Sequence, residues 1–474
     1  MDSEWLERQY KREDIISRMP DDVLSHIISR LEAKDAVKTC VLSTRWKNVW
    51  TLMYNFYFNL DTDGKGNRRT LFVNFVELVL RRSQSKSIQN FHLKTYYGFE
   101  ESDAIRLIEL LCWAADHNVC SLILKFFYAV ERPMIRLPQS ILTCKSLVKL
   151  SLGFSDFVMD IPDCTVCFSC LKFLSIYIDS PNSNSLQKLF RSCPILEELK
   201  IKGSYPTPEN VVTIDIDVPT LKKLKIQLVI DYFDIWLHTF VVRASNLEYL
   251  DLGDYYLPSI VVGETPFLNK VILGNGYVHV WLLNESSEDE ATMCATEFFR
   301  AISSTRFLSL DIKYATVGYL NGNLPFFRNL IYLDLGIDIV AGFALLVEFF
   351  NNSPNLEVLN LEVLGLEKEV EEGWYNNQFE LGCVPSCMLF HLKEIYFFLE
   401  ETLESYMEGA IKCLLENCKV LERFSVETDT CSCTDEQEIL NRILNFPRAS
   451  PICEIEFVDY SCKEKLQSKF NKYR

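Results

Sequence analysis

The stretch Leu147-Val-Lys-Leu-Ser-Leu152 decides the fold, because its leucines stand at the first, fourth and sixth positions of a short pattern that recurs along the chain. A single copy has too few apolar residues to enclose a core, so copies with a regular period bury their leucines by stacking on one another. The period predicts a stack of short strands, one from each copy. Successive copies lie 24, 25, 25, 26 and 21 residues apart, and after Leu147 they begin at Leu171, Leu196, Leu221, Leu247 and Leu268.

A period of about 20 to 29 residues is typical of leucine-rich repeats. Amphipathic helices are expected before several copies, at residues 186–194, 343–354 and 407–418. Strands and helices in alternation predict an α/β fold, in which irregular leucine-rich repeats form a horseshoe-shaped solenoid over residues 88–383. Further clear copies begin at Leu330 and Leu356, and weaker ones at Ile88, Val119, Phe307, Leu392 and Leu421.

A compact helical block is expected at residues 14–60, ahead of the repeats. Pro20 suits the first position of a helix, and apolar residues from Val23 to Leu31 then form one continuous stripe. Asp35 and Ser43 are candidate caps for two further short helices. Three short helices cannot bury this apolar surface alone. The stripe therefore either contacts a partner protein or packs on the repeats behind it.

The stretches Asp14-Ile-Ile-Ser-Arg-Met-Pro-Asp-Asp-Val-Leu-Ser-His-Ile-Ile-Ser-Arg-Leu31 and Lys34-Asp-Ala-Val-Lys-Thr-Cys-Val-Leu-Ser-Thr-Arg-Trp-Lys-Asn-Val-Trp50 resemble an F-box. Met19 stands where Leu is more usual, which conserves volume. The resemblance implies docking onto a Skp-type adaptor and, through it, onto a cullin–RING ubiquitin ligase. The adaptor contacts that it implies are Met19, Pro20, Val23, Leu24, Ile27, Leu31, Val41, Trp46 and Trp50.

A second resemblance lies near the carboxyl end. The segments Val384-Pro385, Leu414-Leu-Glu-Asn-Cys-Lys-Val-Leu-Glu422 and Phe446-Pro-Arg-Ala-Ser450 resemble the FBD module of plant F-box proteins. Together the resemblances are to the plant F-box/FBD/leucine-rich-repeat family. The expected divisions are an F-box at 14–60, a connecting segment at 61–87, repeats at 88–383, the FBD module or terminal repeats at 384–458, and a tail at 459–474.

The polar positions of the repeat strands define a candidate binding face. Third, fifth and seventh positions of each copy point away from the leucines, and they change from basic to acidic along the chain. Aromatic and charged residues together favour a protein target, whereas half-exposed strands also carry such residues without any partner. The candidate substrate-binding residues are Lys200, Lys202, Lys223, Lys225, Tyr249, Asp251, Tyr332 and Asp334.

Composition restricts the class of partner and the cellular location. The formal net charge of −17 disfavours nucleic acid, because phosphate backbones are repelled. We expect no membrane segment, because the amino terminus has no apolar signal region and no apolar run reaches the ~18 residues that a membrane helix needs. The 17 cysteines then read as small buried residues of an intracellular protein of the cytoplasm or nucleus.

No catalytic motif or cofactor is indicated. Cys164, Cys167 and Cys170 have a metal-like spacing but no suitable fourth ligand, so packing is favoured over metal. The six histidines are scattered. Together with the F-box resemblance, this implies a non-catalytic subunit that recognises the substrate of a Skp–cullin–F-box ubiquitin ligase and binds an unknown protein. The alternatives are a repeat scaffold without ligase recruitment and a small-molecule-dependent co-receptor.

Overall fold

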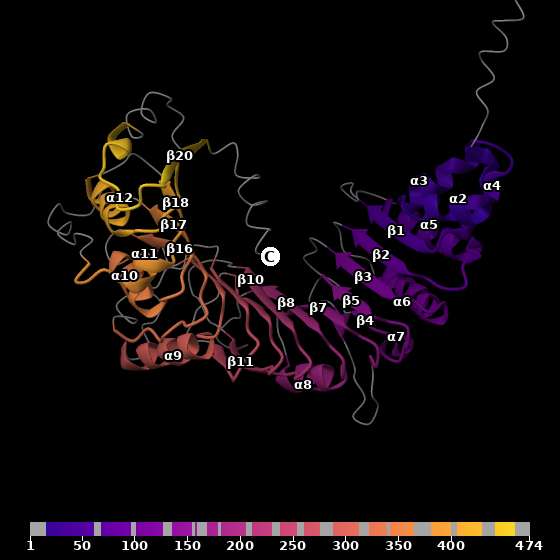
Figure 1. Cartoon of the computed structure of the whole chain (residues 1–474). Coiled ribbons are helices and arrows are strands. Elements are labelled where there is room, and N and C mark those ends of the chain that lie inside the picture. The colour runs from indigo at the N-terminus through magenta and orange to yellow at the C-terminus, as the bar shows by residue number, and fades with distance from the viewer. Residues whose placement is uncertain are drawn as a thin grey trace, which may run out of the picture. The chain divides into compact units, whose positions relative to one another are not determined.

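The computed structural model (Figure 1) divides the chain into two compact units, Met1–Gly203 and Ser204–Arg474. The residues that the structure describes are 16–60, 68–95, 101–126, 135–153, 157–158, 168–178, 182–204, 211–229, 238–253, 260–274, 288–311, 322–338, 342–364, 381–399, 405–428 and 441–459.

The first unit contains a parallel sheet whose strands neighbour one another in chain order. A helix crossover follows several of the strands, as parallel pairing requires. A separate pair of short strands comprises β4 (Ile135–Arg136) and β6 (Phe157–Val158). The main strands are β1 (Asn55–Leu60), β2 (Asn90–Thr95), β3 (Ser121–Phe126), β5 (Lys149–Leu152), β7 (Phe173–Ile178) and β8 (Glu198–Ser204).

The second unit contains a parallel sheet of the same kind. A smaller parallel sheet has the order β13 (Ile260–Val262), β11 (Thr239–Arg243), β9 (Thr213–Asp217). The main strands are β10 (Lys223–Val229), β12 (Tyr249–Asp251), β14 (Lys270–Leu273), β15 (Phe307–Asp311), β16 (Tyr332–Asp338), β17 (Val358–Leu364), β18 (Glu394–Leu399), β19 (Arg423–Thr428) and β20 (Glu454–Asp459).

Short helices form the amino-terminal block, and longer ones connect the strands. The block contains η1 (Ile16–Arg18), α2 (Asp21–Ile28), α3 (Ala33–Lys38), η2 (Thr39–Val41), α4 (Trp46–Val49) and η3 (Trp50–Leu52). The connecting helices are α5 (Arg68–Arg82), α6 (Glu101–Asp116), α7 (Gln139–Leu142), α8 (Ser183–Arg191), α9 (Glu288–Ala301), α10 (Gly342–Asn352), α11 (Ser386–Phe390) and α12 (Ser405–Asn417).

The repeating leucines form the core of each unit, as their period predicts. Leu147 and Leu150 are fully buried and Leu152 is 3% exposed. A turn precedes the strand, and in it the Leu147 amide donates to the Cys144 carbonyl at 3.3 Å. The same turn recurs before later strands, for example from Leu196 to Cys193. The turn gives each strand a fixed starting point, so the strands pair in register and stack their leucines.

Two strands begin where the sequence pattern was misread. The repeat copy that was expected to begin at Phe307 begins at Thr305 instead. Thr305 is buried at the position where other copies have leucine, and Phe307 is the first residue of β15. In the first unit, β1 begins at Asn55, inside the residues expected to be F-box, and pairs with β2. The sheet therefore begins one strand before the expected start at residue 88.

The expected helix caps Asp35 and Ser43 are wrong. Helix α3 begins at Ala33, so Asp35 lies in its first turn, and α4 begins three residues after Ser43. Neither helix has a side-chain hydrogen bond at its cap. In contrast, α8, α10 and α12 match the helices expected before their strands.

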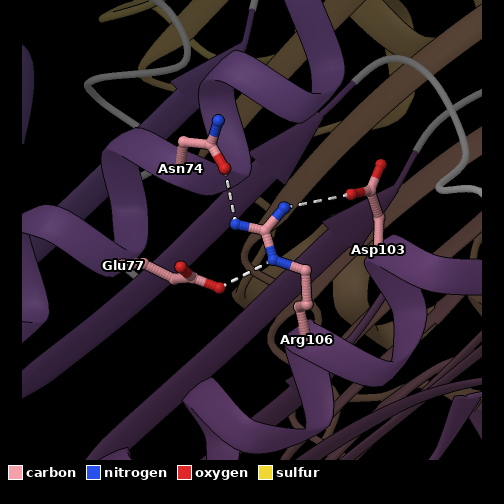
Figure 2. A network of polar contacts seen from close by, with 4 residues as sticks. All are labelled: Asn74, Glu77, Asp103 and Arg106. Atoms are coloured by element: carbon pink, nitrogen blue, oxygen red, sulfur yellow. Dashed lines mark hydrogen bonds and ion pairs between the residues drawn. The ribbon is translucent and has the colours of Figure 1, made fainter.

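A polar network joins α5 to α6 in the first unit (Figure 2). Arg106 of α6 donates from Nε to Glu77 Oε1 at 2.7 Å and from Nη2 to Asn74 Oδ1 at 2.6 Å. Its Nη1 lies 3.5 Å from Asp103 Oδ1. The bond from Arg106 lowers the pKa of the Glu77 carboxyl, although partial burial opposes this shift. The network fixes two helices that belong to consecutive crossovers.

Some expectations concern features that these residues do not decide. The horseshoe shape of the whole chain and the FBD character of residues 384–458 stay predictions. Cys164 and Cys167, together with the tail from residue 460, lie outside the described residues. Within the part of the chain that the structure describes, no group of three or more His, Cys, Asp or Glu residues is arranged to hold a metal ion.

Candidate adaptor interface and polar sheet face

Helix α2 carries the apolar stripe expected from the sequence, and the structure divides that stripe in two. Leu24 and Ile28 are fully buried, whereas Val23 and Ile27 are 43% and 41% exposed. Leu31, just beyond the helix, is 36% exposed. An eight-residue helix turns one edge of its stripe inward and leaves the other outside. The stripe therefore both forms a core and presents an apolar surface.

More exposed apolar residues lie in the same block. Ile16 of η1, Val41 of η2 and Leu42 beside it are 54%, 83% and 64% exposed. Contiguous exposed apolar surface marks interaction sites in soluble proteins. We call Ile16, Val23, Ile27, Leu31, Val41 and Leu42 the exposed F-box residues.

Three expected contact residues are core residues of the block. Leu24 is fully buried, and Trp46 and Trp50 are 4% and 6% exposed. Met19 is half-buried and Pro20 is exposed. Leu24, Trp46 and Trp50 therefore support the exposed F-box residues from beneath in this structure. Contact of the remaining residues with an adaptor stays a prediction.

An arginine ties the third helix of the block to the start of the first. Arg45 Nη2 donates to the Met19 carbonyl at 2.5 Å and to Asp21 Oδ1 at 2.6 Å. This pair is surface-exposed, so its energetic contribution is small. Its geometric effect is to hold the Met19–Pro20 turn against α4.

The block is also bonded to the first strand of the sheet. Ser25 Oγ donates to the Leu52 carbonyl at 2.8 Å, and the Tyr54 amide donates to Ser29 Oγ at 3.1 Å. Asn55 Nδ2 of β1 donates to the Ser29 carbonyl at 3.0 Å. These bonds join the amino-terminal helices to the repeat strands of the first unit without an intervening linker.

The second site is the polar face, the side of the second unit's sheet opposite its buried leucines. Lys225 and Asp251 meet there, with Lys225 Nζ donating to Asp251 Oδ2 at 2.6 Å. The same oxygen accepts from Tyr249 Oη at 3.1 Å, and the Gly253 amide donates to Oδ1 at 3.2 Å. Asp251 is only 4% exposed. The hydrogen bonds of this carboxylate are thus satisfied within the chain. The charges of Lys225 and Asp251 cancel each other, so the expected change from basic to acidic residues produces no net charge at this point.

The other expected substrate residues are spread along both units. Lys200 and Lys202 lie on β8 of the first unit, and Lys223 is exposed at the start of β10. Tyr332 and Asp334 lie together on β16, where Asp334 accepts from Ser309 Oγ at 2.8 Å and from Asn360 Nδ2 at 2.7 Å. Their role in binding stays a prediction.

Residues beyond Asp334 were not among the candidates, yet they complete an apolar cluster on this face. Val358 and Tyr396 are 4% and 8% exposed, and Tyr332 packs against them. Tyr396 Oη donates to Glu394 Oε2 at 2.6 Å. Burial, followed by Glu394, raises the pKa of Tyr396 to about 12. Reading the third and fifth positions of the later copies at Leu356 and Leu392 identifies all three additional residues.

Two family descriptions match the chain. Residues 16–58 match the F-box domain. Residues 108–269 match the leucine-rich repeats of the FBD-associated F-box protein At5g56370. These matches cover the exposed F-box residues and the repeat strands from β3 to β12.

Relatives match the chain along almost its whole length. The chain is 25% identical over 458 residues to the F-box/FBD/LRR-repeat protein At5g56420 of Arabidopsis thaliana, covering 94% of this chain and 99% of that protein. The chain is a homologue of the F-box/FBD/LRR-repeat proteins. It is also 27% identical over 460 residues to the putative FBD-associated F-box protein At3g50710 and 28% identical over 476 residues to the F-box/FBD/LRR-repeat protein At1g13780, both from Arabidopsis thaliana. Those matches cover 93% of this chain and 99% and 97% of the relatives.

This F-box/FBD/LRR-repeat homologue therefore carries an F-box followed by a leucine-rich-repeat region. None of the helices that the structure describes has both the length and the apolar character needed to cross a membrane.

Proposed function

We propose that the chain is the substrate-recognition subunit of a Skp–cullin–F-box ubiquitin ligase. The observation that carries the proposal is the set of exposed F-box residues inside a matched F-box domain. Val41 at 83% exposure and Leu42 at 64% are unusual for a helical block that otherwise has a closed core. A Skp-type adaptor is the partner that an F-box generally binds, so these residues are the proposed adaptor interface.

Within this interface, Val23, Ile27, Leu31 and Val41 make the proposed direct contacts. Met19 and Pro20 contribute from the turn that Arg45 holds. Burying such side chains against a partner contributes roughly 25 cal/mol for each Å² of apolar surface removed from water. Leu24, Trp46 and Trp50 form the core of the block and contribute to adaptor binding only by supporting the exposed residues.

The bonds between the block and β1 support a positioning role. Because Ser25, Ser29 and Asn55 join helix to strand directly, an adaptor on the block has a defined geometry relative to the repeats of the first unit. A ligase subunit without catalytic groups acts by raising the effective concentration of its target beside the ubiquitin carrier. A fixed connection between block and repeats raises this effective concentration more than a flexible linker of equal length does.

The proposed target contacts are Lys200 and Lys202 on β8 in the first unit, and Lys223, Tyr332 and Asp334 on β10 and β16 in the second unit. Reversing Lys200, Lys202 and Lys223 to Glu tests the basic part. Lys225 is left out of this variant because its replacement would leave the buried carboxylate of Asp251 without its cationic partner. Weakened target capture with an unchanged Tm supports the site, whereas unchanged capture places the target elsewhere.

The ligase role itself is tested in cells with the cullin pathway blocked. Proteins that co-purify with the intact chain are compared with those from the Val23→Asp/Ile27→Asp variant, in which two charges occupy exposed helix positions. We expect both forms to capture the same target, and only the intact form to bring cullin with it. Equal cullin recovery contradicts the proposed interface. No cullin with either form favours a repeat scaffold that recruits no ligase.

A further inference from the structure

The main sheet of the first unit has a side opposite its buried leucines, which we call the basic face. Leu122, Leu124 and Leu150 are fully buried, and the residues that alternate with them point to the other side of the strands. Parallel pairing from β1 to β8 sets those residues in three rows across the strands. The rows are Asn55, Asn90, Ser121, Lys149, Phe173 and Glu198; then Tyr57, His92, Ile123, Ser151, Ser175 and Lys200; then Asn59, Lys94, Lys125, Tyr177 and Lys202.

The second and third rows contain cations without carboxylates. Their described positions include Lys94, Lys125, Lys200 and Lys202, and no Asp or Glu. Glu198, in the first row, is the one carboxylate at the described positions of this face, so it can offset one ammonium at most. Lys202 is exposed and the other three lysines are half-buried, as expected where the aliphatic stem of lysine lies along a sheet and its ammonium reaches water. Such a concentration of positive charge attracts an anionic partner.

Two of these lysines act on one histidine. Lys94 follows His92 on the same side of β2, and Lys125 lies beside Lys94 on β3. On β1 the Tyr57 ring flanks the histidine, with 6.2 Å between the ring centroids. Burial, followed by Lys125 and Lys94, lowers the pKa of His92. The two ammoniums therefore raise the positive potential at one end of the basic face, and an anion bound there would relieve their repulsion.

An aromatic residue lies between this end and the cations of β8. Tyr177 of β7 is half-buried and lies beside Lys202. Between Tyr177 and Lys125, Gly153 follows the end of β5, and its amide donates to the Leu124 carbonyl at 2.7 Å. Glycine has no side chain, so at this level none stands between the lysine and the tyrosine. Tyrosine with charged neighbours is typical of protein interfaces. The row thus presents a cation, an aromatic ring and a second cation.

The distance between the two cationic ends fits a short extended segment. The strands β3, β5, β7 and β8 lie side by side in chain order (Figure 1). Three spacings of about 4.8 Å place the backbones of Lys125 and Lys202 roughly 14 Å apart. An extended chain advances about 3.3 Å per residue, so roughly four residues cover this distance. A short segment also feels little of the chain's net charge of −17, because charges beyond about 10 Å are screened, whereas a long polyanion such as nucleic acid is repelled.

We propose that the basic face of the first unit binds a short anionic segment of another protein. Carboxylate or phosphoryl groups of the segment lie against Lys94 and Lys125 at one end and against Lys200 and Lys202 at the other. An apolar side chain between them packs on Tyr177. The inference rests on the proposed function only in treating that protein as the ligase target. It adds the chemistry of the target, which the F-box does not specify.

The test measures peptide binding to the full chain by fluorescence anisotropy. One labelled synthetic peptide has a central Leu-Phe between two pairs of Glu, and a second has phosphoserine in place of each Glu. We expect at least one of these probes to bind, with an affinity that falls as salt rises. The tighter of the two identifies carboxylate or phosphoryl groups as the anions. Absence of binding by both probes overturns the inference.

Two further probes test the geometry of the site and the class of partner. A permuted peptide of the same composition has its anionic residues contiguous, and is expected to bind about fivefold more weakly because it cannot reach both ends. A single-stranded oligonucleotide of equal charge is also expected to bind more weakly than the anionic probe. Equal affinity for the permuted peptide contradicts the spacing of the two ends. Tighter binding of the oligonucleotide overturns the proposal of a protein partner.

Matched charge reversals locate the site. Lys94→Glu/Lys125→Glu is expected to weaken binding of the anionic probe about tenfold or more. Lys86→Glu/Lys145→Glu makes the same change of net charge at exposed positions before β2 and β5, and is expected to leave affinity unchanged. Equal weakening by both variants means that total charge alone attracts the probe, which contradicts a site.

Other variants report the second cationic end and the aromatic ring. Lys200→Glu/Lys202→Glu is expected to weaken binding by a similar factor, because both ends hold the segment. Tyr177→Ala is expected to weaken binding at high salt as well, since screening leaves an apolar contact intact. Tm and adaptor capture are measured for every variant and are expected to stay unchanged. Failure of the wild type to bind either anionic probe while it captures the adaptor refutes this inference and leaves the proposed ligase role standing.

Discussion

Val23 and Leu24 are neighbours in the chain with different physical environments. Leu24 is fully buried in the core of the helical block, while Val23 is 43% exposed one position earlier. A helix rotates about 100° for each residue, so of two adjacent apolar residues at the edge of a stripe one can face the core and the other the solvent. Substitutions at the two positions therefore test stability and binding independently.

The first prediction concerns Leu24→Ala. Removing the buried side chain leaves a cavity, and the free energy of unfolding of the first unit is expected to fall by about 2–5 kcal/mol. Denaturant unfolding followed by tryptophan fluorescence measures it, since Trp46 and Trp50 lie in the same block. Val23→Ala serves as the control and is expected to change the free energy by less than about 1 kcal/mol. Equal effects contradict the assignment of Leu24 to the core.

The second prediction concerns Arg106, which joins α5 to α6. Its side chain and that of Glu77 are 25% and 20% exposed, so Arg106→Met is expected to cost about 1–2 kcal/mol at neutral pH. The matched control Lys38→Met removes the i,i+3 pair with Asp35, whose side chains are 64% and 56% exposed. That variant is expected to unfold like the wild type.

The Arg106 effect depends on pH in a direction that follows from Glu77. Because the pKa of Glu77 is lowered in the folded chain, its pair with Arg106 contributes fully above the unfolded pKa of about 4–5. The contribution is lost as pH falls through the lowered folded pKa. The difference in unfolding free energy between wild type and Arg106→Met should therefore shrink on acidification. A difference that stays constant down to full protonation contradicts an ionic contribution.

At the scale of elements, alternation within strands and the period between copies were sufficient to predict most repeat strands. The copy at Leu147 was placed correctly because three leucines mark it, whereas Thr305 hid the true start of β15. The strand at Asn55 was missed because its aromatic alternation follows the F-box without a helix or linker between them. The spacing of apolar residues indicates where a strand begins only when the buried residue at the first position of the copy is itself apolar.

The candidate sites were less predictable than the fold, for a physical reason. A helical stripe does not reveal which of its edges is covered, so Leu24 and Val23 looked equivalent in sequence. On the polar face, Lys225 and Asp251 looked like a change of charge, but pairing across β10 and β12 makes them partners. Which side chains pair across two strands depends on the register of the strands. The register follows from the turns before them, which the sequence of a single copy does not reveal.

The third prediction concerns close packing of β8 against β7 in the first unit. A Cβ at Gly203 would overlap the Ile178 carbonyl oxygen, so Gly203→Ala must displace one strand. We expect the unfolding free energy to fall by about 1–3 kcal/mol, measured by thermal or denaturant unfolding. Gly409→Ala in α12 is the control, because no atom lies within 4 Å of its Cβ position. In that helix alanine should be neutral or stabilising. Comparable loss in both variants argues against the strand contact.

At the scale of the whole molecule, the amino-terminal block also protects an edge of the sheet. Strand β1 pairs with β2 on one side, and α3 contacts β1, with Asn59 Nδ2 3.4 Å from Glu32 Oε1. Parallel sheets leave unpaired backbone groups at an edge, which promote association between chains unless they are covered. The block is thus part of the repeat fold as well as the proposed adaptor interface.

The fourth prediction follows from this arrangement. Deleting residues 1–60 removes β1 and exposes the edge of β2, so the shortened chain is expected to aggregate at concentrations where the full chain is monodisperse. Light scattering measures this. The full-length Val23→Asp/Ile27→Asp variant is the control and should stay monodisperse. A soluble, folded deletion would show that β2 needs no cover.

The central claim is that the exposed F-box residues bind a Skp-type adaptor. Its most direct test is calorimetric titration of a purified adaptor into the full chain. The wild type is compared with Val23→Asp/Ile27→Asp and with Val261→Asp/Phe267→Asp, which places the same charges at 51% and 63% exposed apolar positions of the second unit. We predict binding by the wild type and by the second variant, and loss of binding, at unchanged Tm, by the first. Equal binding by all three forms, or none by the wild type, would contradict the account.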